Sequence, residues 1–460
     1  MSAVMQDRPA VSARRALRFL TAGSVDDGKS TLIGRLLYDS RAILADQLEH
    51  LHQRAASAGR AADAAPFDLS LLTDGLEAER EQGITIDVAY RYFATPARKF
   101  IIADAPGHEQ YTRNMVTAAA GSDAAVVLVD ITKLDLSAGP AGPVRLLPQT
   151  RRHSLLARLL RVPSIVFAVN KIDAVAEPGK AYAAVSQALQ AFAQEAGLPL
   201  AGIVPVSALR GDNVATPLQA PWYQGPTLLQ LLEGLPNEGD EGDEERGPAA
   251  TPAEAEADHG NTFSLPVQYV AREGDGTGEL PRVFWGRVAT GVVRVGDELQ
   301  VFPSGERAVV AALRHARGDV ALVPAGQSAG VVLDRQLDIS RGDWLAAPGR
   351  LASVQRFSAT LAWLDLEAAT PGRKYWLRHG HRWVQARLLA ITQRLDIHTL
   401  QGQPAESLAV NEIGEVVFEL QQPLPLAPYA QQRVGGALIV VDPSSHRTSG
   451  ALLVRGALGA

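Results

Sequence analysis

Eight residues near the start of the chain have the types and spacing needed to hold a phosphate group. The segment Gly23-Ser-Val-Asp-Asp-Gly28-Lys29-Ser30 fits the pattern G-x-x-x-x-G-K-[ST]. Its glycines let backbone N–H groups close around phosphate oxygens, and Lys29 adds a positive charge. The Ser30 hydroxyl is an oxygen ligand that suits Mg²⁺. We therefore predict a phosphate site made of Gly23, Ser24, Val25, Asp26, Asp27, Gly28, Lys29, Ser30 and Thr31.

The setting of this pattern matters, because a lone match has a substantial false-positive rate. Leu17–Ala22, directly before it, is a short apolar run of strand type. Directly after it, Leu32, Ile33, Leu36 and Leu37 recur at helical spacing. The glycines are therefore predicted to lie on a strand-to-helix turn, the setting in which phosphate-binding loops work.

A second group of residues follows the apolar run Lys99–Asp104. A carboxylate at the C-terminal end of a strand can hold hydrated Mg²⁺. The backbone N–H of Gly107 can reach the γ-phosphate, and His108 can orient the attacking water or stabilise developing charge. This predicts a site made of Asp104, Ala105, Pro106, Gly107 and His108, with Asp104 acting on the metal through water.

Thr85 is a further candidate, placed between a charged stretch and the apolar run that begins at Ile86. A hydroxyl here could complete the Mg²⁺ shell only while the γ-phosphate is present. Thr85 could equally be a β-branched strand residue, and spacing alone leaves both interpretations open. The predicted metal set is Ser30, Thr85 and Asp104, and the predicted catalytic set is Lys29, Thr85 and His108.

The base is expected to be read after the strand-like run Ser164–Val169. Guanine offers two N–H donors on one edge, and the Asp173 carboxylate can accept both, whereas adenine would leave it facing a lone pair. The Lys171 stem can cover the ring, and backbone N–H groups of Ser207 and Ala208 can meet the guanine carbonyl. The predicted cofactors are therefore GTP and Mg²⁺, with base contacts from Asn170, Lys171, Ile172, Asp173, Ser207, Ala208 and Leu209.

A second segment, Thr132-Lys133-Leu-Asp135, also fits the pattern [NT]-K-x-D. It follows the apolar run Ala124–Asp130, which is one strand too early for base recognition, and it opens a Gly/Pro-rich loop. We favour Asn170–Asp173 as the base site, and Asp135 remains the alternative.

Composition limits the class of protein. The chain has 460 residues, 46% of them hydrophobic and 20% charged, which suits about two to four globular domains. It has no cysteine, as expected in a reducing cytoplasm, and no apolar run long enough for a membrane span. Its net charge of −6 argues against nucleic acid as a partner. The first apolar run leads directly into the phosphate pattern, so we predict no cleaved signal peptide.

The pattern of apolar runs predicts three domains and a linker. Residues 16–236 alternate strand-like and helical runs, which predicts an α/β GTPase domain with a mostly parallel sheet and helices on both faces. Residues 237–261 are acidic and rich in Gly, Ala and Pro, as in a flexible linker. Short β runs predict two antiparallel β-barrels, over 262–349 and 353–457. We expect His379-Gly-His381 to lie at a barrel surface. We expect tryptophans 285, 344, 363, 376 and 383 to lie in the barrel cores.

This combination resembles the elongation factor Tu class of translational GTPases. It is more similar to the large GTPase subunit of bacterial sulfate adenylyltransferase (ATP sulfurylase). Asp27 stands where translation factors typically have His. The similarity is specific across the GTPase domain and weaker in the barrels, and the loop over 133–148 looks longer than in the family. The segments that carry the resemblance are Ser24–Ser40, Glu77–Phe93, His108–Met115 and Gln149–Ser154.

The resemblance implies a subunit that couples GTP hydrolysis to the formation of adenosine 5′-phosphosulfate and pyrophosphate from ATP and sulfate. The adenylyl transfer would be carried by a small partner subunit, at which ATP and sulfate act. Some relatives carry a C-terminal adenylyl-sulfate kinase domain, and we expect no kinase activity here. Two alternatives remain, a translation-type factor and a GTP-switched binding module, because a nucleotide pocket alone does not separate them.

Overall fold

The computed structural model describes residues 15–43, 69, 88–105, 112–136, 144–237, 263–272, 281–315, 318–396 and 401–459. Thr85, Pro106, Gly107 and His108 therefore lie outside the described residues. Contacts within the chain divide it into two compact units. The described residues up to Asn237 belong to the first unit, and those from Phe263 to the second.

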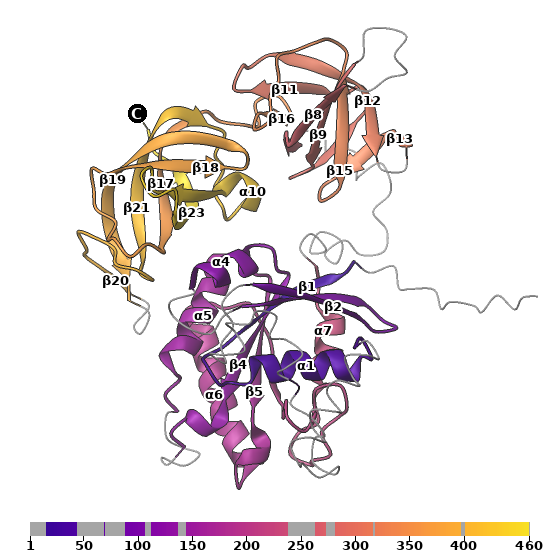
Figure 1. The fold of residues 1–460 in the computed structure, drawn as a ribbon, viewed down its shortest axis with the longest axis vertical. Helices are drawn as coiled ribbons and strands as arrows, with labels where there is room; N and C mark the ends of the chain where they lie inside the picture. Colours follow the sequence, from indigo (N-terminus) through magenta and orange to yellow (C-terminus); the bar gives the residue numbers. More distant parts are fainter. Residues whose placement is uncertain are drawn as a thin grey trace, which may run out of the picture. The chain divides into compact units, whose positions relative to one another are not determined.

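The first unit is built on one six-stranded sheet in the order β2-β3-β1-β4-β5-β6. Only β2 is antiparallel, to β3, and every other pairing is parallel (Figure 1). All seven residues of β4 and of β5 are buried, as expected for strands covered on both faces. The strands are β1 Leu17–Ala22, β2 Ala89–Ala94, β3 Lys99–Asp104, β4 Ala124–Asp130, β5 Ser164–Asn170 and β6 Leu200–Pro205.

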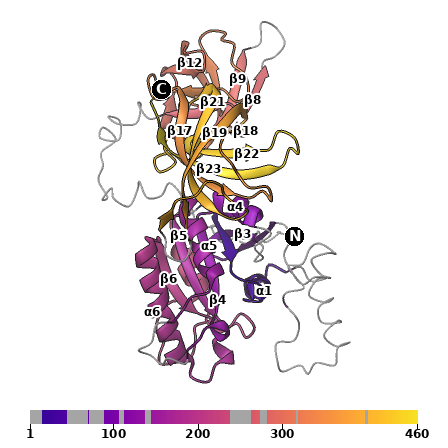
Figure 2. The same cartoon turned by 90° about the vertical axis from the view of Figure 1, so that its left-hand side faces the viewer.

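Helices cover both faces of this sheet (Figure 1). Leucines of α1 and α7 share one apolar core with the sheet, while α4, α5 and α6 lie on the other face. Figure 2 shows β4, β5 and β6 in succession, with α6 at the β6 end. The helices are α1 Lys29–Asp39, α4 Thr112–Ala120, α5 Pro148–Leu159, α6 Pro178–Ala196 and α7 Leu228–Gly234, with 3₁₀ turns η3 Ile131–Lys133 and η4 Ile172–Ala174.

This strand order brings the predicted nucleotide segments to one edge of the sheet. Because β3, β1, β4 and β5 run parallel, the segments that follow them emerge side by side. Thr21 of β1 lies opposite Asp104 of β3, and Asp130 of β4 lies opposite Asn170 of β5. The predicted α/β domain is confirmed.

The second unit begins with an antiparallel sheet in the order β7-β16-β11-β12-β15-β9-β8, with β13 beside β12. A separate pair, β10 and β14, contributes Val293 and Val323 to the same apolar core. The strands are β7 Ser264–Pro266, β8 Tyr269–Arg272, β9 Arg282–Arg287, β10 Val292–Arg294, β11 Glu298–Phe302, β12 Arg307–His315, β13 Gly318–Val320, β14 Leu322–Pro324, β15 Ser328–Leu333 and β16 Trp344–Ala346.

The run Leu265–Val270, which reads as a single strand in the sequence, is divided here. β7 ends at Pro266 and pairs with β16, whereas β8 begins at Tyr269 and pairs with β9. The chain changes partner strand at this point, so one apolar run supplies two short strands.

The last sheet closes into a barrel. Its order is β18-β22-β23-β17-β21-β19-β20, and an additional pairing of β18 with β19 completes the ring. Closure removes the open strand edges that would otherwise expose unpaired backbone groups. The elements are β17 Val354–Trp363, β18 Lys374–His379, β19 Arg382–Leu395, β20 Gly402–Gln403, β21 Ile413–Leu424, the short helix α10 Arg433–Gly436, β22 Ala437–Val441 and β23 Thr448–Ala457.

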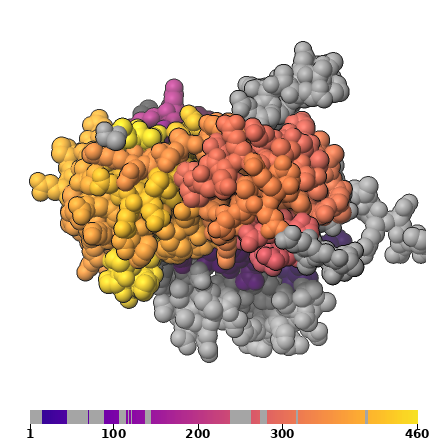
Figure 3. Space-filling view, turned by 90° about the horizontal axis from the view of Figure 1, so that it is seen from above, coloured from indigo at the N-terminus to yellow at the C-terminus, as the bar shows by residue number. Residues whose placement is uncertain are grey.

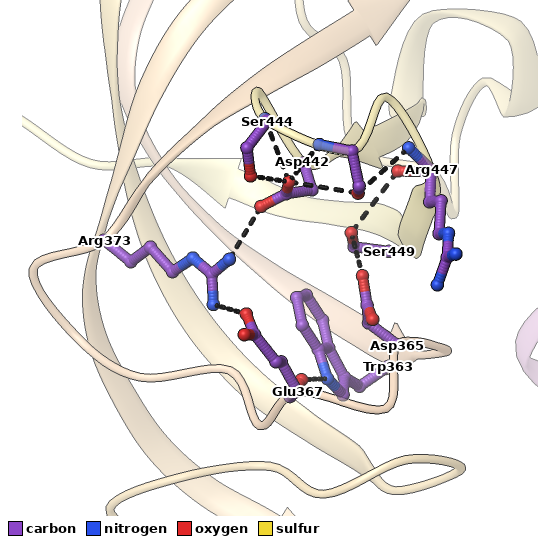
Figure 4. Close-up of polar contacts among 9 residues, drawn as sticks. Trp363, Asp365, Glu367, Arg373, Asp442, Ser444, Arg447 and Ser449 are labelled. Atoms are coloured by element: carbon purple, nitrogen blue, oxygen red, sulfur yellow. Dashed lines mark hydrogen bonds and ion pairs between the residues drawn. The ribbon is translucent and has the colours of Figure 1, made fainter.

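A polar network fixes one end of this barrel (Figure 4). Arg373 donates to Glu367 at 2.6 Å and to Asp442 at 2.7 Å. Asp442 also accepts bonds from the hydroxyl and N–H of Ser444 and from the N–H of Ser445. The Ser444 hydroxyl and these neighbours hold the pKa of Asp442 well below its usual range. The carboxylate therefore stays ionised and ties the β22–β23 turn to the loop after β17.

The predicted tryptophan core is only partly correct. Trp344 and Trp363 are buried, but the side chain of Trp383 is 47% exposed. Trp383 lies beneath the guanidinium of Arg378, 5.5 Å from its carbon, which can shield an exposed ring. Trp383 therefore lies on the surface of the barrel and not in its core.

His379 corrects a second expectation, because it is fully buried rather than at a barrel surface. Its ring stacks on Trp344 with centroids 5.3 Å apart, and Nε2 lies 3.1 Å from the Gly435 carbonyl oxygen. Nearby, Arg382 pairs with Asp343 at 2.9 Å. The stacking of His379 on Trp344 and the Arg382–Asp343 pair join the two larger sheets of the second unit, whose surfaces lie side by side in Figure 3.

We predict that His379 makes the second unit sensitive to acid. Burial lowers the pKa of His379 from 6.5 to about 4. The folded state therefore binds a proton at His379 less readily than the unfolded state does. The contribution of neutral His379 to the free energy of unfolding is complete above pH 6.5 and is lost as the pH falls toward 4. The loss should reach about 2–3 kcal/mol by pH 4.5. Urea unfolding followed by tryptophan fluorescence should show a shallower decline for His379→Gln.

His446→Gln is the matched control, because that histidine is exposed. An equal pH dependence in wild type and His379→Gln would contradict the role given to His379.

Candidate nucleotide site

The phosphate loop, residues 23–30, has the backbone shape that its glycines predict. Gly28 precedes α1 with φ +92°, and Gly23 has φ +153°. A Cβ on Gly28 would lie 2.4 Å from Asn170 Nδ2, and one on Gly23 would lie 3.1 Å from the Leu128 carbonyl oxygen. Both positions need glycine, since a side chain would be strained and would meet a neighbouring group.

Lys29 places its ammonium group inside this loop. Nζ donates to the carbonyl oxygens of Gly23 at 3.0 Å and Ser24 at 2.8 Å, and the residue is 7% exposed. Burial lowers the Lys29 pKa, while the charges of Asp104 and Asp27 oppose that shift. A positive charge in so dry a place attracts an anion more strongly than it would in water.

The oxygen ligands expected for a divalent cation stand beside the loop. Asp104, at the end of β3, is 2% exposed and accepts a bond from the Thr21 hydroxyl at 3.3 Å. Ser30 lies in the first turn of α1. Hydroxyl and carboxylate oxygens fit Mg²⁺. Among the described residues, no group of three or more His, Cys, Asp or Glu that could hold a metal ion is found.

Asn170 joins three of the predicted segments. Its side chain is buried, its Nδ2 donates to the Asp27 carbonyl oxygen at 2.8 Å, and its Oδ1 accepts from the Ala208 N–H at 3.0 Å. The amide therefore links the phosphate loop, the end of β5 and the loop after β6. Sequence alone could not assign this structural role to Asn170.

The carboxylate of Asp173 lies beside this bridge. η4 follows Lys171, whose left-handed φ of +65° turns the chain after β5. Asp173 Oδ2 is 3.6 Å from Arg210 Nε, and the Arg210 side chain is 64% exposed. A pair of this length whose arginine is mostly exposed is weak, so Asp173 can exchange it for a ligand.

The loop after β6 departs from expectation in one respect. The Ser207 N–H donates to the Asp212 carbonyl oxygen at 3.0 Å, and the Ala208 N–H donates to Asn170. Both N–H groups predicted to meet the guanine carbonyl are thus engaged within the protein. A base would have to share the Ala208 N–H or use that of Leu209, whose own carbonyl oxygen accepts a bond from Arg35 at 2.7 Å.

The alternative segment Thr132–Asp135 lies beside the phosphate loop. Lys133 ends η3, and its Nζ is 2.8 Å from Asp27 Oδ1 on the phosphate loop. Its neighbour Asp130 contacts Lys171 of the favoured base segment at 2.7 Å. The sequence analysis does not name Asp130 as part of the site, and it considers Lys133 only within the alternative base motif. The signal available in the sequence for Asp130 is its place at the end of the apolar run Ala124–Asp130.

Comparison with known proteins agrees with this geometry. The elongation factor Tu GTP binding domain family matches residues 14–237, and the GTP-eEF1A C-terminal domain-like family matches residues 356–455. Sulfate adenylyltransferase subunit 1 of Laribacter hongkongensis is 42% identical over 96% of this chain and 85% of its own length. The bifunctional enzyme NodQ of Azospirillum brasilense is 43% identical over 96% of this chain and 67% of its own length.

The chain belongs to the sulfate adenylyltransferase subunit 1 family. Sulfate adenylyltransferase subunit 1 of Citrobacter koseri is likewise 43% identical over 95% of this chain and 86% of its own length. Membership confirms the resemblance seen in the sequence and the expectation of an enzyme subunit with a GTP-binding domain.

We predict that Asp173→Asn shifts base preference from guanine toward xanthine. The amide N–H of the Asp173→Asn variant would face a donor, the exocyclic amine, on guanine. Xanthine has a carbonyl oxygen at that position, which can accept the amide hydrogen bond. The ratio of dissociation constants for GDP and xanthosine diphosphate measures the change. Glu177→Gln, four residues away in an exposed ion pair with Lys180, is the control. An unchanged preference in Asp173→Asn would place base recognition elsewhere.

Proposed function

We propose that this chain is the GTP-hydrolysing subunit of a sulfate adenylyltransferase. It couples GTP hydrolysis to the formation of adenosine 5′-phosphosulfate and pyrophosphate from ATP and sulfate. The observation that carries this proposal is the Asn170 bridge, which assembles one nucleotide cradle in a chain 42% identical to a sulfate adenylyltransferase subunit 1.

The chain's own residues divide the work of hydrolysis in this proposal. Lys29 binds the β- and γ-phosphates, and backbone N–H groups of the loop orient them. Ser30, Asp104 (through water) and Thr85 would hold Mg²⁺, which would screen the phosphate charge. His108 orients the attacking water.

Coupling is needed because the phosphosulfate anhydride lies uphill of ATP and sulfate. The partner is a small subunit that carries the adenylyl transfer and binds ATP and sulfate. Among the helices in the described part of the chain, none is long and apolar enough to cross a membrane. With a net charge of −6 and no cysteine, we place the complex in the cytoplasm, with neither nucleic acid nor membrane as a partner.

The domain arrangement follows the same proposal. We propose that residues 16–236 form the GTPase domain and residues 262–349 and 353–457 the two β domains, joined by the acidic linker 237–261, which apart from Asn237 lies outside the described residues. The linker composition supports this, since it is too polar to build a core.

Reconstitution with a purified small subunit tests the coupling. We expect sulfate-dependent pyrophosphate release from ATP to rise when GTP is added and to stay low with a non-hydrolysable GTP analogue. If GTP leaves this release unchanged, the coupling proposal fails while nucleotide binding stands. A translation-type factor would instead bind RNA with a steep dependence on salt.

We predict that His108→Ala slows GTP hydrolysis by about 10²-fold, because general acid–base and positioning groups contribute on that order. GTP affinity should change little, since the residue is assigned to the water and not to the phosphates. Single-turnover hydrolysis and equilibrium binding, measured on the same preparation, separate the two effects. Wild-type turnover in His108→Ala would remove this histidine from the mechanism.

A further inference from the structure

Lys133 is a charged residue at the nucleotide site to which the proposed function gives no task. Its Nζ donates to the Val25 carbonyl oxygen at 2.6 Å and to Asp27 Oδ1 at 2.8 Å. The Lys133 side chain is 33% exposed, whereas that of Asp27 is completely buried. A lysine from the end of the β4 segment thus reaches across to the phosphate loop.

Asp27 explains why the loop needs this lysine. Its Oδ2 accepts the Ser24 N–H at 2.6 Å, which closes the turn at the start of the loop. A buried carboxylate is costly unless it is paired, and here it lies in the loop that must receive anionic phosphates. The Lys133 ammonium supplies the compensating positive charge.

The local fold aims Lys133 at this position. Asp130 caps η3 by accepting bonds from the Thr132 N–H at 2.9 Å and the Thr132 hydroxyl at 2.6 Å. This cap fixes the turn from which Lys133 projects. Asp130 Oδ2 also lies 2.7 Å from Lys171 Nζ and 3.9 Å from Lys133 Nζ.

Asp130 stays ionised in this setting. Burial raises its pKa, but hydrogen bonds from Lys171 and Thr132 outweigh burial, and the net pKa is lowered. Asp27, Lys133, Asp130 and Lys171 therefore form a row of alternating charges. The row runs from the phosphate loop to the segment that reads the base.

We propose that Lys133 is a positioning residue of the nucleotide site, which neutralises Asp27 and holds the Val25 carbonyl so that the loop can accept phosphates. The inference rests on the proposed nucleotide site and adds a residue to it. Without Lys133, the Asp27 carboxylate would repel the phosphates and draw the Lys29 ammonium toward itself. Asp27 and Lys133 both act electrostatically on Lys29, with opposite signs.

A double-mutant cycle on the full chain tests this inference. Dissociation constants and release rates of fluorescent GDP are measured for wild type, Lys133→Met, Asp27→Asn and the double variant. We expect Lys133→Met to weaken GDP binding at least tenfold, mainly through faster release. In the Asp27→Asn background, Lys133→Met should change the GDP affinity by no more than about threefold, because that background has no Asp27 carboxylate to leave unpaired.

Two further variants separate charge compensation from general damage. Lys133→Arg keeps a cation that can donate to both oxygens, so it should bind GDP within about threefold of wild type. Lys180→Met removes a lysine from an exposed ion pair with Glu177 and should behave as wild type. Thermal unfolding of each variant monitors folding.

The outcomes distinguish this inference from the proposed function. Three results would each overturn the inference and leave the proposed function standing. They are a Lys133→Met variant with wild-type affinity, a tenfold loss that persists in the Asp27→Asn background, and a Lys133→Arg variant that binds as weakly as Lys133→Met. Absence of GDP binding by the wild-type chain would overturn the proposed function and this inference with it.

Discussion

The site depends on one buried amide. Asn170 donates to the phosphate loop and accepts from the loop after β6, so it fixes the distance between the segment predicted to bind phosphates and the segments predicted to bind the base. Gly28 must lack a side chain because this amide occupies the space that a Cβ would fill. The Asn of the N-K-x-D pattern is therefore a structural tie as well as a candidate base contact, and its removal should loosen two loops at once.

The first unit could be predicted largely from sequence, because its signals are local. β1, β3 and β4 coincide with the apolar runs that the sequence shows, whereas the order of the strands is known only from their pairing in the structure. The second unit was harder, since each antiparallel strand depends on a distant partner. The run at Leu265–Val270 changes partner at Pro266, and His379 is buried by a tryptophan from another sheet. Neither fact has a local signature.

The site shows the same division between local and distant information. Motif spacing predicted a set of candidate residues, but not how their charges balance. Lys133 was considered for the base because its pattern resembled the base motif, and the structure places it on the phosphate side. Pairing between Asp27 and Lys133 spans 106 positions, so it is visible only once β1 and β4 are known to be neighbours. The backbone bonds of Ser207 and Ala208 were likewise beyond sequence reasoning.

Charge balance also bears on why the loop carries Asp27 at all. A carboxylate there closes the turn through the Ser24 N–H, but it adds a negative charge where phosphates must bind. The fold resolves this conflict with Lys133 of η3, the turn that follows the neighbouring parallel strand β4, and Asp130 fixes its position by capping η3. Since Asp130 also contacts Lys171, a change at either end of the row alters the charge felt at the other. The phosphate and base halves of the site are therefore joined twice, by the Asn170 amide and by this row of charges.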